Sequence, residues 1–178
     1  MKSIRYAVPF IAGVVTLLTT EWSSTQAAMI SYEVSDLGAG RWKYTYEVKN
    51  VSLAQPVNEF TIWFNRSRYA NLAVASSNPP ASTWSELVVQ PDPVLHDDGF
   101  YDALQTPGGI GIGTSVGGFA VEFDWLATGQ PGAQPFDIID PVSLQTRYSG
   151  ITVPEPSTLA LLALGGLVTI RRQARSSR

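Results

Sequence analysis

Apolar and polar residues alternate with a period of two along several stretches of this chain. In the clearest stretch Trp42, Tyr44, Tyr46 and Val48 alternate with charged residues and a threonine. Successive side chains of a β-strand point to opposite faces, so this pattern predicts a strand with one buried and one wet face. The same spacing recurs in residues 30–34, 60–64 and 119–125.

Turn-forming residues separate these strands. Clusters rich in glycine, proline, asparagine and aspartate occupy residues 36–40, 78–80, 91–93, 107–109 and 129–135. No segment between the two ends of the chain carries a sustained helical period. Short strands with turn signals at this density predict an all-β fold, an antiparallel β-sandwich of immunoglobulin-like or jelly-roll type, with a small open barrel as the alternative.

The first 28 residues have the organisation of a signal peptide. Lys2 and Arg5 precede an uncharged, mostly apolar run over residues 7–20, and small residues surround the predicted cut after Ala27 or Ala28. We therefore expect an N-terminal signal helix that the general secretion machinery reads and signal peptidase removes. An uncleaved N-terminal membrane anchor is the alternative.

The chain ends in a motif, an apolar run and a basic tail. Val153-Pro154-Glu155-Pro156-Ser157 leads into the uncharged residues 158–170. As a helix this run would span roughly 20 Å, short of the roughly 30 Å bilayer core, so it predicts a short and marginal transmembrane helix. The arginines that follow would lie on the cytoplasmic side and stop translocation. They are Arg171, Arg172, Arg175 and Arg178.

This order of elements resembles the PEP-CTERM sorting signal of Gram-negative bacteria that make extracellular polysaccharide. The resemblance implies that an exosortase, a multi-pass membrane enzyme, recognises Pro154, Glu155 and Pro156 and processes the signal. It also implies passage through the inner membrane, followed by residence in the cell envelope or outside the cell. The expected organisation is a signal peptide (1–28), a β-sandwich domain (29–150) and a sorting signal (151–178). A plain C-terminal tail anchor is the alternative.

The region between the targeting ends is acidic and lacks cysteine. Residues 29–153 contain thirteen acidic and six basic residues, a formal net charge of −7, whereas the basic ends bring the whole chain to −3. Such a domain has no electrostatic reason to bind nucleic acid. Without cysteine, neither disulfides nor thiolate metal sites can stabilise it, so its stability has to come from packing.

Candidate catalytic chemistry is sparse. His96 is the sole histidine, and no Gly-x-Ser-x-Gly elbow accompanies it. We therefore expect no enzymatic activity and no cofactor, with a hydrolase that uses surface carboxylates as an alternative. Asp97, Asp98 and Asp102 supply hard oxygen ligands around Gly99, so a weak calcium site is a second alternative to a plain acidic turn.

The aromatic residues are the one feature of the domain that indicates ligand binding. Sixteen Trp, Tyr and Phe side chains fall in residues 29–153, and most lie on the period of the buried face. We expect Trp63 and Trp84 to be the exceptions, with rings free to stack on sugars. The leading hypothesis is a non-enzymatic exported protein of the envelope or extracellular matrix. The alternative is a carbohydrate-binding module that acts on exopolysaccharide.

Overall fold

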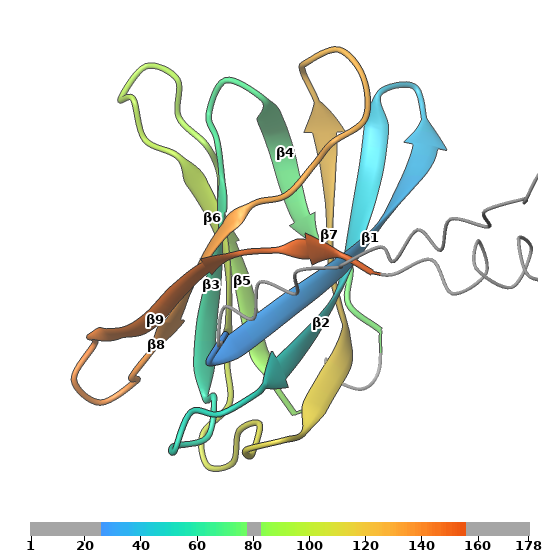
Figure 1. The fold of residues 1–178 in the computed structure, drawn as a ribbon. Helices are drawn as coiled ribbons and strands as arrows, with labels where there is room; N and C mark the ends of the chain where they lie inside the picture. The colour runs from blue at the N-terminus through green and yellow to red at the C-terminus, as the bar shows by residue number, and fades with distance from the viewer. Residues whose placement is uncertain (1–25, 78–82, 156–178) are drawn as a thin grey trace, which may run out of the picture.

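The computed structural model describes residues 26–77 and 83–155 and shows two β-sheets that lie against each other (Figure 1). These residues form strands, turns and loops, and no helix among them is long and apolar enough to cross a membrane. The first sheet contains, in spatial order, β10 (Val153–Pro154), β1 (Ala28–Gly38), β2 (Arg41–Asn50), β7 (Ser115–Trp125) and β4 (Tyr69–Val74). The second contains β5 (Ser85–Val89), β6 (Gly99–Leu104), β3 (Glu59–Phe64), β8 (Pro135–Ile139) and β9 (Thr146–Ile151).

The strands follow the alternation in the sequence. In β2, Tyr44, Tyr46 and Val48 are buried, while Thr45 and Glu47 between them are partly exposed and Lys49 is exposed. The same inward face continues across β7, where Phe119 and Phe123 are fully buried. Because large apolar side chains occupy every second position, each strand has only one register that buries them. The prediction of an all-β fold is confirmed for the described residues.

The core lies between the two sheets and is mainly aromatic. Phe60 of the second sheet meets Phe119 of the first edge to face, with ring centroids 4.9 Å apart. Phe64 and Phe123 approach across the same space at 6.2 Å. Edge-to-face contacts of this kind add to the free energy gained from burying the rings. The two sheets therefore pack face to face, and all strand pairs except β1–β10 are antiparallel.

The buried amide of Asn50 organises the loops at one end of the sandwich. Asn50 is fully buried, and its Nδ2 donates hydrogen bonds to the carbonyls of Leu53, Gln55 and Ile110 at 3.3, 3.1 and 3.1 Å. Its Oδ1 accepts the backbone N–H of Leu53. Since buried polar groups need partners, this one side chain satisfies carbonyls from two separate loops.

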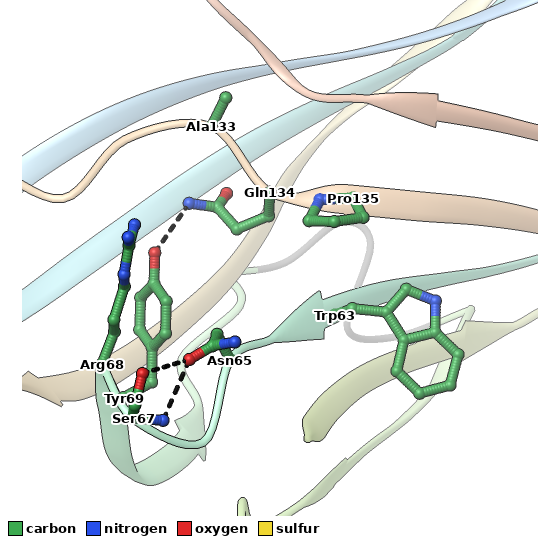
Figure 2. Close-up of a pocket in the computed structure, with 8 residues that line it drawn as sticks. All are labelled: Trp63, Asn65, Ser67, Arg68, Tyr69, Ala133, Gln134 and Pro135. Atoms are coloured by element: carbon green, nitrogen blue, oxygen red, sulfur yellow. Dashed lines mark hydrogen bonds between the residues drawn. The ribbon is translucent and has the colours of Figure 1, made fainter. Parts of the chain in front are cut away.

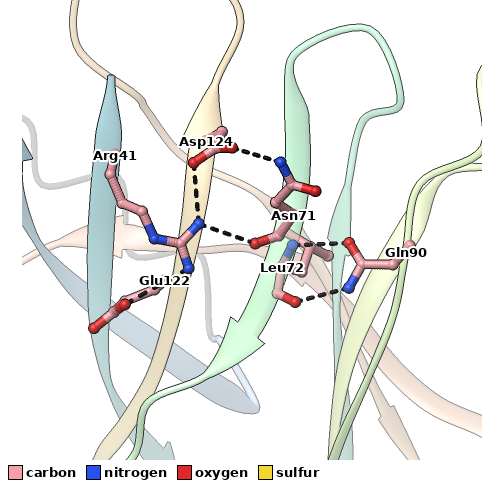
Figure 3. Close-up of polar contacts among 6 residues, drawn as sticks. All are labelled: Arg41, Asn71, Leu72, Gln90, Glu122 and Asp124. Atoms are coloured by element: carbon pink, nitrogen blue, oxygen red, sulfur yellow. Dashed lines mark hydrogen bonds and ion pairs between the residues drawn. The ribbon is translucent and has the colours of Figure 1, made fainter. Parts of the chain in front are cut away.

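Side chains also join the two sheets at the β4 and β5 edges (Figure 3). The amide of Gln90, just after β5, accepts the N–H of Leu72 at 2.8 Å and donates to its carbonyl at 2.7 Å. Leu72 lies on the edge strand β4, so Gln90 takes the place of a neighbouring strand there. Satisfying the backbone of an edge strand removes a template for pairing with another chain.

A second polar cluster surrounds Asp124 on the same side (Figure 3). Arg41 Nη1 donates to Asp124 Oδ1 at 3.0 Å and to the carbonyl of Asn71 at 3.2 Å, and Arg41 Nη2 lies 3.6 Å from Glu122 Oε2. Hydrogen bonds from Asn71 and Arg41 lower the pKa of Asp124. Asn71 adopts a left-handed φ of 51° at an irregularity in β4. These bonds tie β2, β7 and β4 together on the solvent side of the sheet.

The two predicted terminal helices lie outside the described residues, apart from the last residues of the predicted signal peptide. Ala28 is fully buried at the start of β1 and pairs with Asn50. The carbonyl of Ala27 accepts the N–H groups of Val51 and Ser52 at 3.1 and 3.0 Å. A cut after Ala27 would leave Ala28 in the sheet, whereas a cut after Ala28 would remove it. The position of cleavage stays a prediction.

Candidate functional site

The predicted recognition motif begins inside the first sheet. Val153 and Pro154 form the edge strand β10, which runs parallel to β1 with Val153 opposite Ser31 and Pro154 opposite Tyr32. The N–H of Glu155 then donates to the carbonyl of Tyr32 at 2.9 Å. Three residues of the motif are therefore paired with the first strand of the domain, and Pro156 lies outside the described residues.

The carboxylate of Glu155 lies among acidic neighbours. Ser31 Oγ donates to Glu155 Oε1 at 3.4 Å, a long hydrogen bond. Partial burial raises the pKa of Glu155 above its ordinary value, and the nearby carboxylates of Glu33 and Glu47 raise it further. The contact between this side chain and the sheet is thus opposed by like charge.

Thr152 anchors the start of β10 by reciprocal bonds with Gln134. Both residues are 1% exposed. The N–H of Thr152 donates to the carbonyl of Gln134 at 2.8 Å, and the N–H of Gln134 donates to Thr152 Oγ1 at 2.9 Å. The chain passes from the second sheet to the first at this point, so the bonds fix where it crosses.

Gln134 also belongs to a buried network of tyrosine hydroxyls. Tyr46 donates to Gln134 Oε1 at 3.2 Å, and Gln134 Nε2 donates to the hydroxyl of Tyr69 at 3.1 Å. The hydroxyl of Tyr44 donates to the carbonyl of Gly132 at 2.6 Å and lies 3.3 Å from that of Tyr69. Burial, and next the neighbouring Tyr69, raise the pKa of Tyr44. Burial likewise raises the pKa of Tyr46, so the hydroxyls of Tyr44 and Tyr46 stay protonated and act as structural hydrogen-bonding groups.

A surface pocket of about 350 Å³ opens above this network (Figure 2). Figure 2 shows Arg68 at one end and the indole of Trp63 at the other. The walls come from the turn between β3 and β4 and from the segment that enters β8. The lining residues are Trp63, Asn65, Ser67, Arg68, Tyr69, Ala133, Gln134 and Pro135.

Trp63 is held in a fixed orientation beside the pocket. Its Nε1 donates to Asp137 Oδ2 at 2.8 Å, and its ring meets Phe100 edge to face with centroids 5.4 Å apart. The side chain is half-buried, so part of the indole remains available to a ligand. An aromatic ring next to a guanidinium and amide groups is suited to a polar ligand with an apolar face.

The prediction that Trp84 offers a free ring is wrong. Trp84 is 6% exposed and packs in the core between Phe60 and Phe119, with ring centroids 5.9 and 5.2 Å away. Both neighbours are fully buried aromatic residues from opposite sheets. Trp84 therefore contributes to packing and has no face to present to a sugar.

The alternative of a calcium site is also wrong, because the three aspartates do not converge. Asp98 Oδ1 accepts the N–H of Arg66 at 2.9 Å and pairs with its guanidinium at 3.3 Å. Asp102 Oδ1 accepts the hydroxyl of Thr61 at 2.7 Å on another strand. Asp97 is exposed in the turn before β6. In residues 26–77 and 83–155 no group of three or more acidic or histidine side chains could hold a metal ion.

The remaining predicted residues are His96 and the C-terminal arginines. His96 is exposed in the turn between β5 and β6, where its φ is 63°. The stop arginines Arg171, Arg172 and Arg175 lie outside the described residues. The pocket residues Asn65, Arg68 and Gln134 were not predicted from the sequence, because the pocket combines segments that are far apart in the chain.

Comparison with known proteins identifies the C-terminal segment. The family description of the PEP-CTERM protein-sorting motif matches residues 152–175. The chain is therefore a protein that carries a PEP-CTERM sorting motif, and the resemblance found in the sequence is confirmed. The matched segment starts at Thr152, so it overlaps the folded domain by the residues that form β10 and its anchor.

The comparisons say less about the domain itself. No curated protein matches the chain. Among solved structures, a chain of a type I cohesin–dockerin complex from Clostridium thermocellum is similar, with 14% sequence identity, 71% of this chain and 99% of that chain covered, and a TM-score of 0.32. A likeness of this size assigns neither ligand nor activity to the present domain.

Proposed function

We propose that this chain is an exported, non-enzymatic protein that an exosortase processes at its C-terminal signal. It passes through the inner membrane and then resides in the cell envelope or the extracellular matrix. The observation that carries the proposal is the sorting motif at residues 152–175, which follows directly on the last long strand of the β domain. A signal peptide over residues 1–28 would supply the export step.

The proposal that the protein is not an enzyme rests on which nucleophilic and acid–base side chains it contains and where they lie. The chain has no cysteine, and its sole histidine, His96, is exposed in a turn and does not line the pocket beside Trp63, so this histidine is not placed to activate a nucleophile there. A hydrolase that uses carboxylates would need one with a raised pKa in a cleft. Burial raises the pKa of Asp102 and of Glu59, but neither residue lines the pocket beside Trp63.

The sorting proposal is tested by replacing Pro154, Glu155 and Pro156 with alanine in a host that contains an exosortase. The unaltered protein should appear with the intact mass of a chain shortened at its C-terminus, in the envelope or medium. The altered protein should keep its C-terminal segment and stay with the inner membrane. Equal masses and locations for the two proteins would overturn the proposal.

Binding of exopolysaccharide in the pocket beside Trp63 is the second candidate function. It is favoured by the fixed, half-buried indole at one end of a polar pocket that also contains Arg68 and Asn65. Sugar rings stack on aromatic faces while their hydroxyls bond to such groups. A guanidinium additionally suits the carboxylates or other anionic groups of an acidic polysaccharide.

The test is a fluorescence titration with the host's own purified polysaccharide. Saturable change in tryptophan emission is expected for the unaltered protein and should be lost in Trp63→Ala. Because the chain has five tryptophans, the control is Trp125→Phe, which removes an indole outside the pocket lining. No saturable change in the unaltered protein would remove this candidate.

A further inference from the structure

We propose that the folded domain controls its own processing by holding the first residues of the sorting motif as strand β10, so that β10 must leave β1 before the exosortase can read the motif. This inference rests on the proposed sorting function. It concerns whether the motif is paired with β1 or released from it when the enzyme binds, which the sorting motif alone does not specify.

The contacts that hold the motif come from both sheets. From the first sheet, the carbonyl of Tyr32 binds the N–H of Glu155 at 2.9 Å, and Ser31 contacts the Glu155 carboxylate at 3.4 Å. From the segment that enters β8 of the second sheet, Gln134 makes two hydrogen bonds to Thr152: its carbonyl accepts the N–H of Thr152, and its N–H donates to Thr152 Oγ1. The matched motif thus begins with one residue that is 1% exposed and continues with residues paired to a neighbouring strand.

An enzyme that binds the motif as an extended peptide needs the backbone and side-chain groups of the motif that β1 now contacts. Proteins that bind extended peptides pair with the backbone N–H and carbonyl groups and take alternate side chains into pockets. Here the N–H of Glu155 is already bonded to Tyr32, and the Glu155 carboxylate lies against Ser31. The enzyme and β1 therefore compete for the backbone N–H and the carboxylate of Glu155, which both contact β1 while β10 is docked.

β10 is held by fewer contacts than the other strands, so it opens more easily than the rest of the sandwich. β10 is two residues long and parallel, whereas its neighbour β1 pairs with β2 over ten register positions. Glu155 lies beside the carboxylates of Glu33 and Glu47, which oppose its docking. Local opening takes place where hydrogen bonds are few and contacts are weak, so β10 can leave while the core stays folded.

A reversible cross-link between β1 and β10 tests whether β10 must leave β1 before the motif is processed. Val153 and Ser31 are directly opposite each other, and the chain has no cysteine of its own. In Ser31→Cys/Val153→Cys the two thiols can form a disulfide in the oxidising envelope, each losing a hydrogen to the oxidising machinery of that compartment. Cross-linking is read from intact mass with and without reductant, and processing from the mass of the C-terminus in an exosortase host.

The cross-linked protein should be processed about tenfold more slowly or not at all, and reductant in the medium should restore processing. The single variants Ser31→Cys and Val153→Cys control for the two changes in sequence, and reductant should leave the processing rate of each unchanged because neither can form the cross-link. Normal processing of the cross-linked protein would overturn the proposal, and so would failure of the two cysteines to pair. If even the unaltered chain is not processed, it is the sorting function that fails.

A second variant leaves the motif and the thiol chemistry untouched. Glu33→Lys replaces a like charge near Glu155 with an attractive one, which should hold β10 more firmly and slow processing by about two- to threefold. Asp97→Lys makes the same charge change in an exposed turn outside the first sheet and should leave processing unchanged. Equal or faster processing of Glu33→Lys than of Asp97→Lys would contradict the proposal.

Discussion

Glu155 of the sorting motif is hydrogen-bonded through its backbone N–H to the carbonyl of Tyr32, 123 positions earlier in the chain, at 2.9 Å. The first strand of the domain and the recognition motif are thus parts of one sheet. A sorting signal joined by a free linker would be read independently of the fold. In this chain, folding and signal presentation are coupled because the same backbone atoms serve both.

Replacing Asn50 by aspartate should destabilise the protein by about 3 kcal/mol or more. The amide Nδ2 donates to three carbonyl oxygens in a fully buried position, and a carboxylate would place negative charge against all three. Urea denaturation followed by tryptophan fluorescence measures the change. Asn65→Asp is the matched control, since Asn65 Oδ1 only accepts hydrogen bonds from Ser67, and should change stability by less than about 0.5 kcal/mol.

Replacing Gln90 by glutamate should weaken the junction between the β4 and β5 edges by about 1–2 kcal/mol. The carboxylate keeps the acceptor for the N–H of Leu72 but loses the donor to its carbonyl, so two oxygens would face each other. Gln105→Glu is the control, because the oxygen of that side chain accepts the N–H of Gly109 and remains in the variant. Equal denaturation midpoints for the two variants would contradict the bridging role of Gln90.

Truncating Trp63 and Trp84, the two tryptophans that the sequence pattern predicted as ligand platforms, should separate their roles. Trp84→Ala should cost about 3–5 kcal/mol, since it leaves a large cavity between Phe60 and Phe119. Trp63→Ala should cost less, because that side chain is half-buried, and should abolish any change in fluorescence with polysaccharide. Thermal denaturation compares the two variants. A larger loss of stability for Trp63→Ala would reverse the assignment.

The strands of the core were predictable because their large side chains repeat without interruption. Tyr44 and Tyr46 in β2, and Phe119, Val121 and Phe123 in β7, occupy every second position, and a period of two indicates a β-strand with one buried face. Trp84 was wrongly predicted to be a free ring because the alternation of apolar residues around it is interrupted. It directly precedes β5, whose inward-facing residues are Glu86 and Val88, and the acidic residue at the second of these three alternating positions hides the apolar pattern. Glu86 is satisfied there by hydrogen bonds from Ser76 and Tyr101, which the sequence does not reveal.

The pocket and the docked motif could not be predicted for a different reason. The pocket combines Arg68 with Gln134, and the docked strand pairs Val153 with Ser31, so both depend on contacts between distant parts of the chain. A two-residue strand is too short to show a period at all. Only the sheet order brings these residues together, and neither composition nor spacing along the chain determines that order.

Replacing Asp102 by asparagine should make the protein more stable at neutral pH, and the advantage should vanish in acid. Burial raises the pKa of Asp102 above its ordinary value, and the hydrogen bond from Thr61 offsets this only in part. The folded state therefore holds the proton of this carboxyl more tightly than the unfolded state does. As pH rises from the ordinary pKa of an aspartate, about 4, through the raised folded value, stability is lost. Asparagine keeps the acceptor for Thr61 and has no proton to lose. It also removes the charge that helps raise the pKa of Glu59, which likewise increases the stability of the variant as pH rises.

Urea denaturation from about pH 3.5 to pH 7.5 should thus show curves of stability against pH that coincide in acid and diverge above about pH 4, with Asp102→Asn the more stable. Asp97→Asn removes the same charge from an exposed turn and should follow the unaltered protein throughout. Parallel curves for Asp102→Asn and the unaltered protein over the whole range would show that burial of this carboxyl does not set the pH dependence of stability.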